Sequence, residues 1–249
     1  NFGWTPEFAE RGGMNPKMFN SFIDGTKSGI EMTASCNATG LTPQPDGLGF
    51  PPSPRMELAE VCKPQEFGGT LTHSGTTEVV SSLDRDLQAV PNHLQMGTYV
   101  VIEADTDYVK HCEEYYMLPD SSFQFAALYR PIHLIGLALG ISVASVVLRN
   151  EPTGTPTGFR SDVAATAKRN LRAGEILDGE GGFTGWGKQT PTEVSLREGY
   201  LPLGLSGNVK LLREVPQGER LRWQDVEMDL TSPVVRIRRE MEAAFGPQS

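Results

Sequence analysis

A group of lysines and acids recurs at helical spacing near the start of the chain. At 100° per residue, a helix over 16–39 would place four charged side chains within about 80° of one another: Lys17, Asp24, Lys27 and Glu31. A lysine in a desolvated site can supply a proton or a positive charge to a reacting oxygen. We therefore predict catalytic roles for Lys17, Asp24 and Lys27. The competing interpretation is that Lys27 only forms helix-surface ion pairs with Asp24 and Glu31.

A second group of polar residues precedes a long apolar run. Tyr129, Arg130 and His133 stand at the head of a helix predicted for 131–148. The free N–H groups of a helix N-terminus and a nearby arginine suit a phosphate or carboxylate, so we predict that these three residues bind the charged group of a substrate. A histidine in an apolar helix can equally be a core residue. The run contains glycine and polar positions and has no polybasic flank, so we expect a buried helix rather than a membrane span.

Two helices with stripes of small residues would position both groups. Asn15 is a good N-cap, Pro16 is favoured at the first helical position and Gly40 is a suitable stop, so one helix is expected between them. Small residues recur along the two predicted helices: Ser21, Gly25, Gly29 and Met32 on the first, Gly136, Gly140 and Ala144 on the second. Because such stripes allow close approach, we predict that the helices pack together with the substrate site between them.

Strand-like alternation at 76–82 and 96–104, followed by a short helix near 107–116, indicates an α+β layer between the two long helices. Composition shifts and a weak internal repeat of short strands and glycine turns then divide the chain further. We predict four ranges: an α+β catalytic and oligomerisation domain with a sheet covered by helices over 1-150, a linker over 151-160, a small β-rich domain over 161-232, and a C-terminal helix and tail over 233-249.

Charge and cysteine content exclude several classes of protein. The chain has 22 basic and 31 acidic residues, a net charge of −9, so we expect no nucleic acid partner. Its three cysteines form no CxxC pair, which argues against a disulfide framework or a thiolate zinc site and favours a cytoplasmic location. We also expect no membrane partner, since no signal peptide is visible.

Three segments resemble a known family. They are the 15–27 segment with Asp24-Gly25-Thr26-Lys27, the 128–144 segment with Tyr129-Arg130-Pro131, and the repeat-bearing 163–182 segment. Together they look like the later portion of bacterial homoserine-dehydrogenase-like oxidoreductases with a C-terminal SAF domain, a β-clip module. That family includes the 1-deoxy-D-xylulose 5-phosphate reductoisomerase-like enzymes of isoprenoid precursor biosynthesis. The resemblance implies that 161-232 is the SAF domain, a lid or an oligomer contact.

The resemblance also implies an NAD(P)H cofactor held by an N-terminal Rossmann domain. No strand followed by Gly-x-Gly-x-x-Gly occurs, and the glycine-rich string at 178–185 has the wrong spacing, so we expect that this chain lacks the Rossmann domain. The expected substrate is a small phosphorylated hydroxyketone and the expected assembly a homo-oligomer, such as a dimer. Reductoisomerisation would be helped by Mg²⁺ or Mn²⁺, with Asp24 and Glu31 as ligands.

Two other functions fit the same residues. One is a homoserine or other aldehyde dehydrogenase that lacks the isomerase step. The other is a non-catalytic binding or assembly protein in which the SAF-like domain is the active part.

Overall fold

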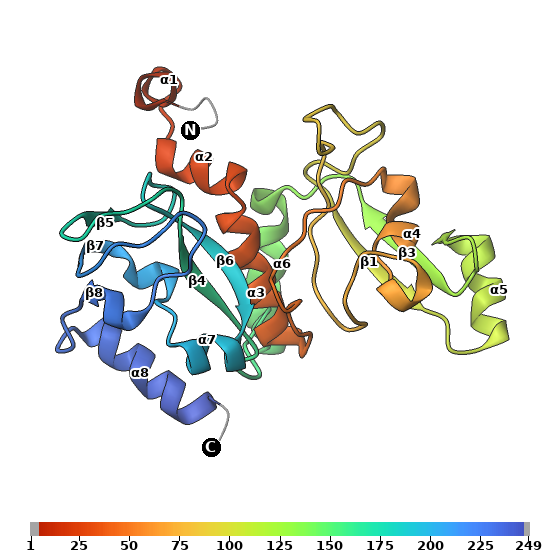
Figure 1. Ribbon diagram of the computed structural model, residues 1–249. Coiled ribbons are helices and arrows are strands. Elements are labelled where there is room, and N and C mark those ends of the chain that lie inside the picture. Colours follow the sequence, from red (N-terminus) through yellow and green to blue (C-terminus); the bar gives the residue numbers. More distant parts are fainter. Residues whose placement is uncertain (1–4, 247–249) are drawn as a thin grey trace. The chain divides into compact units, whose positions relative to one another are not determined.

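The structure is a computed structural model that describes residues 5–246 (Figure 1). The chain forms two compact units: unit 1 comprises Asn1–Leu48 and Pro156–Ser249, and unit 2 comprises Gly49–Thr155. Helices accompany three small sheets whose strands all pair antiparallel, which confirms the α+β class. The division differs from the predicted ranges, because the described residues 5–48 pack with 156–246 rather than with the remainder of 1-150.

Unit 1 begins with three helices, α1 (Pro6–Arg11), α2 (Pro16–Ile23) and α3 (Thr26–Thr39). The side chain of Asn15 accepts a hydrogen bond from the backbone N–H of Lys17, as expected for its N-cap role. The single helix predicted over 16–39 is wrong, because it breaks at Gly25. That glycine adopts φ 85°, a left-handed conformation that residues with a Cβ rarely take, and the backbone turns there between α2 and α3.

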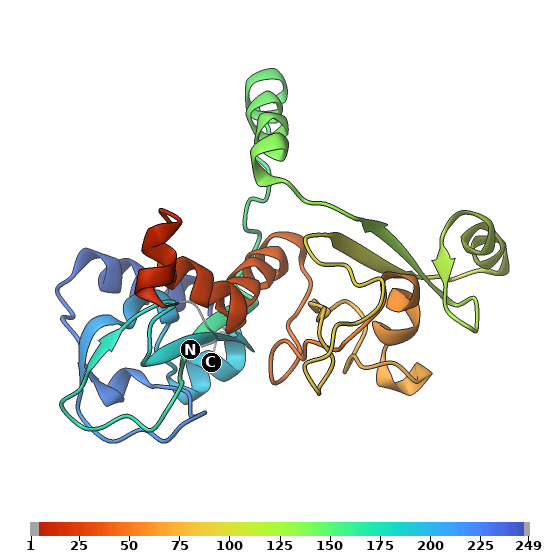
Figure 2. The same cartoon turned by 90° about the horizontal axis from the view of Figure 1, so that it is seen from above.

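Helix α3 packs on a two-stranded ribbon of β4 (Ser161–Ala167) and β6 (Gly185–Pro191) (Figure 2). Every residue of β4 is buried. A Cβ on Gly29 would lie 3.3 Å from the carbonyl oxygen of Gly187, so this glycine lets the helix approach a strand. The two helices of the predicted pair belong to different units, and their packing stays a prediction.

The C-terminal end of α3 is tied to the start of β4 by one side chain. Asn37 donates from Nδ2 to the carbonyl oxygen of Ser161 at 3.0 Å. Its Oδ1 accepts the backbone N–H groups of Arg160 at 2.8 Å and Ser161 at 3.0 Å. The helix and the strand are therefore joined through one amide that uses both of its ends.

The rest of unit 1 is built from short elements around a leucine-rich core. They are β5 (Ile176–Asp178), α7 (Thr192–Glu198), β7 (Gly207–Leu211), β8 (Val226–Glu227), α8 (Pro233–Phe245) and the 3-10 turns Leu203–Leu205 and Trp223–Asp225. Fully buried leucines of this core include Leu171, Leu201 and Leu221. Helix α8 joins the ribbon through Arg238, which lies 2.5 Å from a carboxylate oxygen of Asp162.

Unit 2 holds a three-stranded sheet in the order β1 (Thr98–Glu103), β3 (Phe125–Arg130) and β2 (Leu118–Pro119). The predicted 96–104 strand and 107–116 helix are confirmed as β1 and α5 (Asp107–Tyr116), whereas 76–82 forms no strand. Short helical turns precede the sheet: Arg55–Glu57, α4 (Leu58–Val61) and Gln65–Phe67. Leu58 and Phe125 are buried together on one face of the sheet.

Helix α6 (Ile135–Arg149) contradicts two expectations. None of its residues is buried, so the buried helix predicted for 131–148 is wrong for the described chain. The helix also begins at 135 rather than 131, because the backbone N–H of His133 bonds to the carbonyl oxygen of Met96 at 2.7 Å and holds this segment outside the helix. Across the described residues, no helix is long and apolar enough to span a bilayer: α6 would reach about 22 Å of the roughly 30 Å required.

Candidate active site

The first predicted catalytic residue, Lys17, lies on α2 and reaches a glycine-rich loop of the β-rich part of unit 1. Its Nζ donates to the carbonyl oxygen of Asp178 at 2.6 Å. Asn20 on the same helix donates to the carbonyl oxygen of Gly181 at 3.3 Å. The Asp178 carboxylate accepts the backbone N–H of Phe183, so the loop bends back on itself. Helix α2 and the loop over 178–184 therefore form one hydrogen-bonded assembly.

The second, Asp24, faces a lysine that sequence reasoning did not select. Lys168, which directly follows β4, places Nζ 2.6 Å from Asp24 Oδ2, and the two side chains are 23% and 5% exposed. The other carboxylate oxygen accepts the backbone N–H of Thr26, the first residue of α3, at 2.9 Å. Lys168 Nζ also donates to the carbonyl oxygen of Gly182 at 2.7 Å. Because 144 residues separate Lys168 from Asp24, no local spacing could have linked them.

The hydrogen bonds in this assembly shift one pKa. Burial alone would raise the pKa of Asp178, but the hydrogen bonds from Thr184 and from the backbone N–H of Phe183, together with the nearby Lys17 ammonium, outweigh it. The pKa of this carboxyl therefore lies below its ordinary value of 3.8, and Asp178 is ionised at neutral pH.

The third predicted residue, Lys27, stands in the first turn of α3. Its Nζ lies 3.4 Å from Glu31 Oε1, with side chains 31% and 55% exposed, and 4.6 Å from the centre of the Phe22 ring. The competing interpretation of Lys27 and Glu31 as a helix-surface pair is therefore observed. The pair does not bury the ammonium, which stays accessible to a ligand.

The predicted metal ligands do not face one another. Asp24 faces Lys168, and Glu31 faces Lys27, so each carboxylate already has a cation. Within residues 5–246, no group of three or more histidine, cysteine, aspartate or glutamate side chains is arranged to hold a metal ion. These residues do not fit the Mg²⁺ or Mn²⁺ site expected from the resemblance.

The predicted phosphate-binding residues belong to unit 2. Arg130 and His133 are exposed, and Tyr129 is half-buried beneath the Arg55 guanidinium, 5.9 Å from the ring centre. Tyr129 and Arg130 end strand β3 and His133 lies in the connection after it, so their predicted place at a helix N-terminus is wrong. Arg130 and His133 stay candidates because they are exposed, and Tyr129 stays one because it precedes Arg130 at the end of β3.

Unit 2 also contains a buried lysine that the sequence did not single out. Lys63 Nζ lies 2.8 Å from Asp120 and 2.9 Å from Glu60, and the Lys63 and Asp120 side chains are 4% and 0% exposed. Burial alone would lower the pKa of Lys63, but the hydrogen bonds to these two carboxylates outweigh it and the pKa is raised. This enclosed pair cannot touch a substrate, so we assign it to the stability of unit 2.

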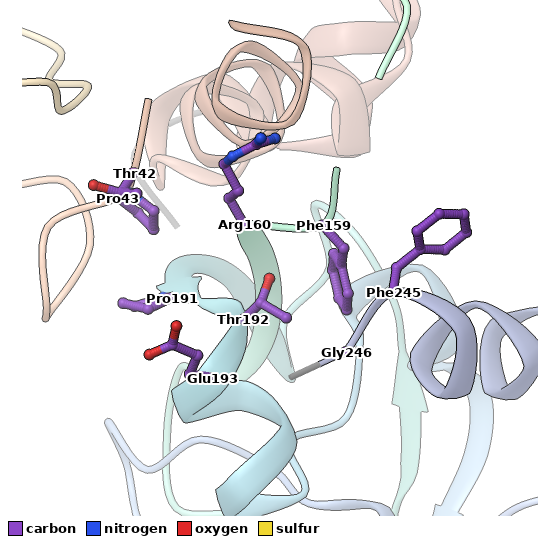
Figure 3. Close-up of a pocket in the computed structure, with 9 residues that line it drawn as sticks. All are labelled: Thr42, Pro43, Phe159, Arg160, Pro191, Thr192, Glu193, Phe245 and Gly246. Carbon is purple, nitrogen blue, oxygen red and sulfur yellow. The ribbon is translucent and has the colours of Figure 1, made fainter. Parts of the chain in front are cut away.

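Unit 1 has a cavity of about 320 Å³ near the C-terminal end of α3. Its lining includes Pro43, Phe159, Arg160, Thr192 and Phe245 (Figure 3). The Arg160 guanidinium is directed away from Thr192, whose hydroxyl oxygen is covered. None of the residues predicted for catalysis lines this cavity.

Comparison with known proteins identifies the class. Residues 4–139, more than half of the chain, match the family model described as "Oxidoreductase DRL, catalytic domain". The protein is thus an oxidoreductase whose catalytic region has the α+β architecture described above. The chain belongs to the family of DRL oxidoreductase catalytic domains. No curated protein matches it.

Proposed function

We propose that the protein is an NAD(P)H-dependent reductoisomerase-like enzyme acting on a small phosphorylated hydroxyketone. In its most specific version, the proposal is that the enzyme acts on 1-deoxy-D-xylulose 5-phosphate in isoprenoid precursor biosynthesis. The family match supports an oxidoreductase. The observation that carries the finer proposal is the gathering of Lys17 and Lys168 on one loop next to the Asp24–Lys27 turn.

The proposed chemistry uses positive charge at the substrate oxygen. A carbonyl that accepts hydride develops negative charge on its oxygen, and preorganised ammonium groups stabilise that charge most where water is partly excluded. Lys27 is 31% exposed and lies against the Phe22 ring, so it combines access with partial shielding. We propose that Lys27 stabilises the charge on the carbonyl oxygen and that Lys17 holds the loop over 178–184 in place.

The described residues do not fit a dinucleotide. Their strands pair antiparallel, and the glycine-rich 178–185 loop joins two strands, whereas a dinucleotide fingerprint lies between a strand of a parallel sheet and a helix N-terminus. We therefore propose that the nicotinamide cofactor binds outside the described residues, and we assign no step to it. This chain's residues would bind the substrate and stabilise charge on its oxygen.

Three further expectations belong to this proposal. Exposed Arg130, with Tyr129 and His133, is proposed to bind a phosphate group on unit 2. The β-rich range 161-232 would be an SAF-like module, and the enzyme a cytoplasmic homo-oligomer.

The test is NADPH oxidation by the full-length protein that contains this chain, with 1-deoxy-D-xylulose 5-phosphate as substrate. We expect turnover, and we expect Arg130→Ala to lower kcat/KM at least tenfold, mainly through KM, without a change in the unfolding temperature. Arg149→Ala, at the end of α6, serves as a control for loss of an exposed arginine. Product analysis separates the alternatives: an isomerised, reduced product supports the proposal, whereas activity confined to a simple aldehyde, or wild-type kinetics in Arg130→Ala, contradicts it.

A further inference from the structure

We propose that Lys168 is a further catalytic residue, contributed by the C-terminal β-rich part of unit 1, and that it donates a hydrogen bond to the reacting carbonyl oxygen of the substrate. Asp24 is then a positioning residue that holds the Lys168 ammonium. This inference rests on the proposed function. It adds a group from outside the region that matches the family model, which ends at residue 139.

The Lys168 ammonium has more donors than the described chain uses. A lysine has three N–H donors. One is directed to the carbonyl oxygen of Gly182 at 2.7 Å. The ammonium is also ion-paired with Asp24 Oδ2 at 2.6 Å, but that contact lacks hydrogen-bond geometry. At least one N–H therefore remains for an oxygen that the described chain does not supply.

Access supports the same assignment. The Lys168 side chain is 23% exposed, whereas the Asp24 side chain is 5% exposed and its Oδ2 is fully covered. A substrate can therefore contact the Lys168 side chain but not the Asp24 carboxylate oxygen behind it. Lys168 is thus the member of the pair that touches the ligand.

The position of the ammonium is fixed from both ends of the side chain. The backbone N–H of Lys168 bonds to the carbonyl oxygen of Thr184 at 3.0 Å, directly after the fully buried strand β4. Ordering a free lysine side chain costs conformational entropy. Here Asp24 and Gly182 hold the chain before a ligand arrives, so that cost does not fall on the transition state.

The chain offers a matched control pair. Lys188 on β6 has a side chain 23% exposed, the same fraction as Lys168, and its Nζ lies 2.8 Å from Asp46. Asp46, however, is 80% exposed, and its ion pairs are with Lys188 and Arg220 rather than with the Asp24–Lys27 turn. Loss of Lys188 therefore removes a lysine of the same exposure, together with its ion pair, without altering the proposed site.

The experiment compares Lys168→Met, Lys168→Arg, Asp24→Asn and Lys188→Met in the full-length protein. Binding of 1-deoxy-D-xylulose 5-phosphate is measured by calorimetry, and kcat and KM by NADPH oxidation. We expect Lys168→Met to weaken binding at least tenfold and to lower kcat at least 100-fold, with Lys168→Arg recovering part of both. Lys188→Met should stay within twofold of wild type. Asp24→Asn combined with Lys168→Met should be no worse than Lys168→Met alone, because the two residues act as one unit.

The outcomes separate this inference from the proposed function. If the wild type binds the sugar phosphate without oxidising NADPH, the reaction is wrong, and the tenfold loss of binding in Lys168→Met still supports the role of Lys168. If Lys168→Met matches Lys188→Met in binding and in kcat, or if the wild type neither binds nor reduces the sugar phosphate, the inference is overturned. Thermal unfolding of the four single variants and of the double variant identifies any loss that comes from misfolding, and Lys168→Arg then gives the deciding comparison.

Discussion

Gly181 lies directly against the main chain of Lys17, so closely that a methyl group at residue 181 would overlap the Lys17 carbonyl. Gly181 also has φ +68°, in the left-handed region. Gly181→Ala should therefore push the loop over 178–184 away from α2 and separate the two elements that hold Lys17.

We expect Gly181→Ala to lower the unfolding temperature by several degrees more than Gly174→Ala. Gly174 has φ +83°, and a methyl group there would meet no atom within 4 Å, so its substitution measures backbone strain alone, about 1–2 kcal/mol. The overlap at Gly181 should add about 2 kcal/mol, roughly 4–8 °C. Equal unfolding temperatures in the two variants would contradict close packing of the loop on α2.

Lys27→Ala separates a catalytic role from a surface role. A partly exposed i,i+4 pair contributes only about 0.3–0.5 kcal/mol, so the unfolding temperature should hardly change. If Lys27 stabilises charge on the substrate oxygen, kcat should fall at least tenfold. Lys210→Ala, which removes an exposed lysine 4.0 Å from Glu227, is the control and should retain full activity. Equal kinetics in the two variants would show that Lys27 forms only the surface ion pair and has no catalytic role.

Lys63→Met tests the buried pair in unit 2. The substitution keeps much of the side-chain volume but leaves the fully buried Asp120 carboxylate without its cation, which should cost about 3–5 kcal/mol. Denaturant unfolding measures the loss. Adding Asp120→Asn to Lys63→Met should recover part of it, because the uncompensated charge is then gone. A simple sum of the two single effects would show that the residues are not coupled.

The same pair predicts sensitivity to acid. Burial alone would raise the pKa of Asp120, but the hydrogen bonds from Lys63, Ser122 and the backbone N–H of Phe125 outweigh it and lower the pKa below 3.8. A lowered pKa in the folded state stabilises the protein above the ordinary value, and that stabilisation is lost as the pH falls through the lowered one. The free energy of unfolding, measured from pH 5 to pH 2, should therefore decline more steeply in the wild type than in Asp120→Asn.

Glu113 on α5 predicts the opposite dependence of stability on pH. It is 2% exposed, neither carboxylate oxygen has a hydrogen-bond partner among the described residues, and burial together with the Asp120 charge raises its pKa above 4.5. Its stabilising effect is present below that value and is lost as the pH rises. Glu113→Gln should thus gain up to about 1 kcal/mol over wild type at pH 7 and nothing at pH 4. Glu114→Gln, an exposed neighbour, should show no such difference.

The sequence predicted those features whose signals are local. The N-cap at Asn15, strand β1 and helix α5 follow from capping chemistry and periodicity, and all three are confirmed. The helix break at Gly25 was missed because the charged residues on either side keep the same helical period. The apolar composition of a segment does not show which other elements cover it, so the apolar run of α6 was wrongly predicted to be buried.

The candidate site shows the same limit over longer distances. Lys17, Asp24 and Lys27 could be selected because they lie within one stretch of chain. Lys168 could not, since its contact with Asp24 depends on how β4 packs against α3. A tertiary contact of this kind produces no regular spacing of residues along the chain, so a single sequence does not reveal it.

The amide of Asn37 has a consequence for how the protein can be produced. Asn37-Ala38-Thr39 matches the acceptor pattern for N-linked glycans. The nitrogen that would carry the sugar is the Nδ2 that bonds to the Ser161 carbonyl, while Oδ1 holds the next two backbone N–H groups. A sugar attached to this asparagine as the chain is made would therefore occupy the nitrogen that joins α3 to β4 and oppose their packing.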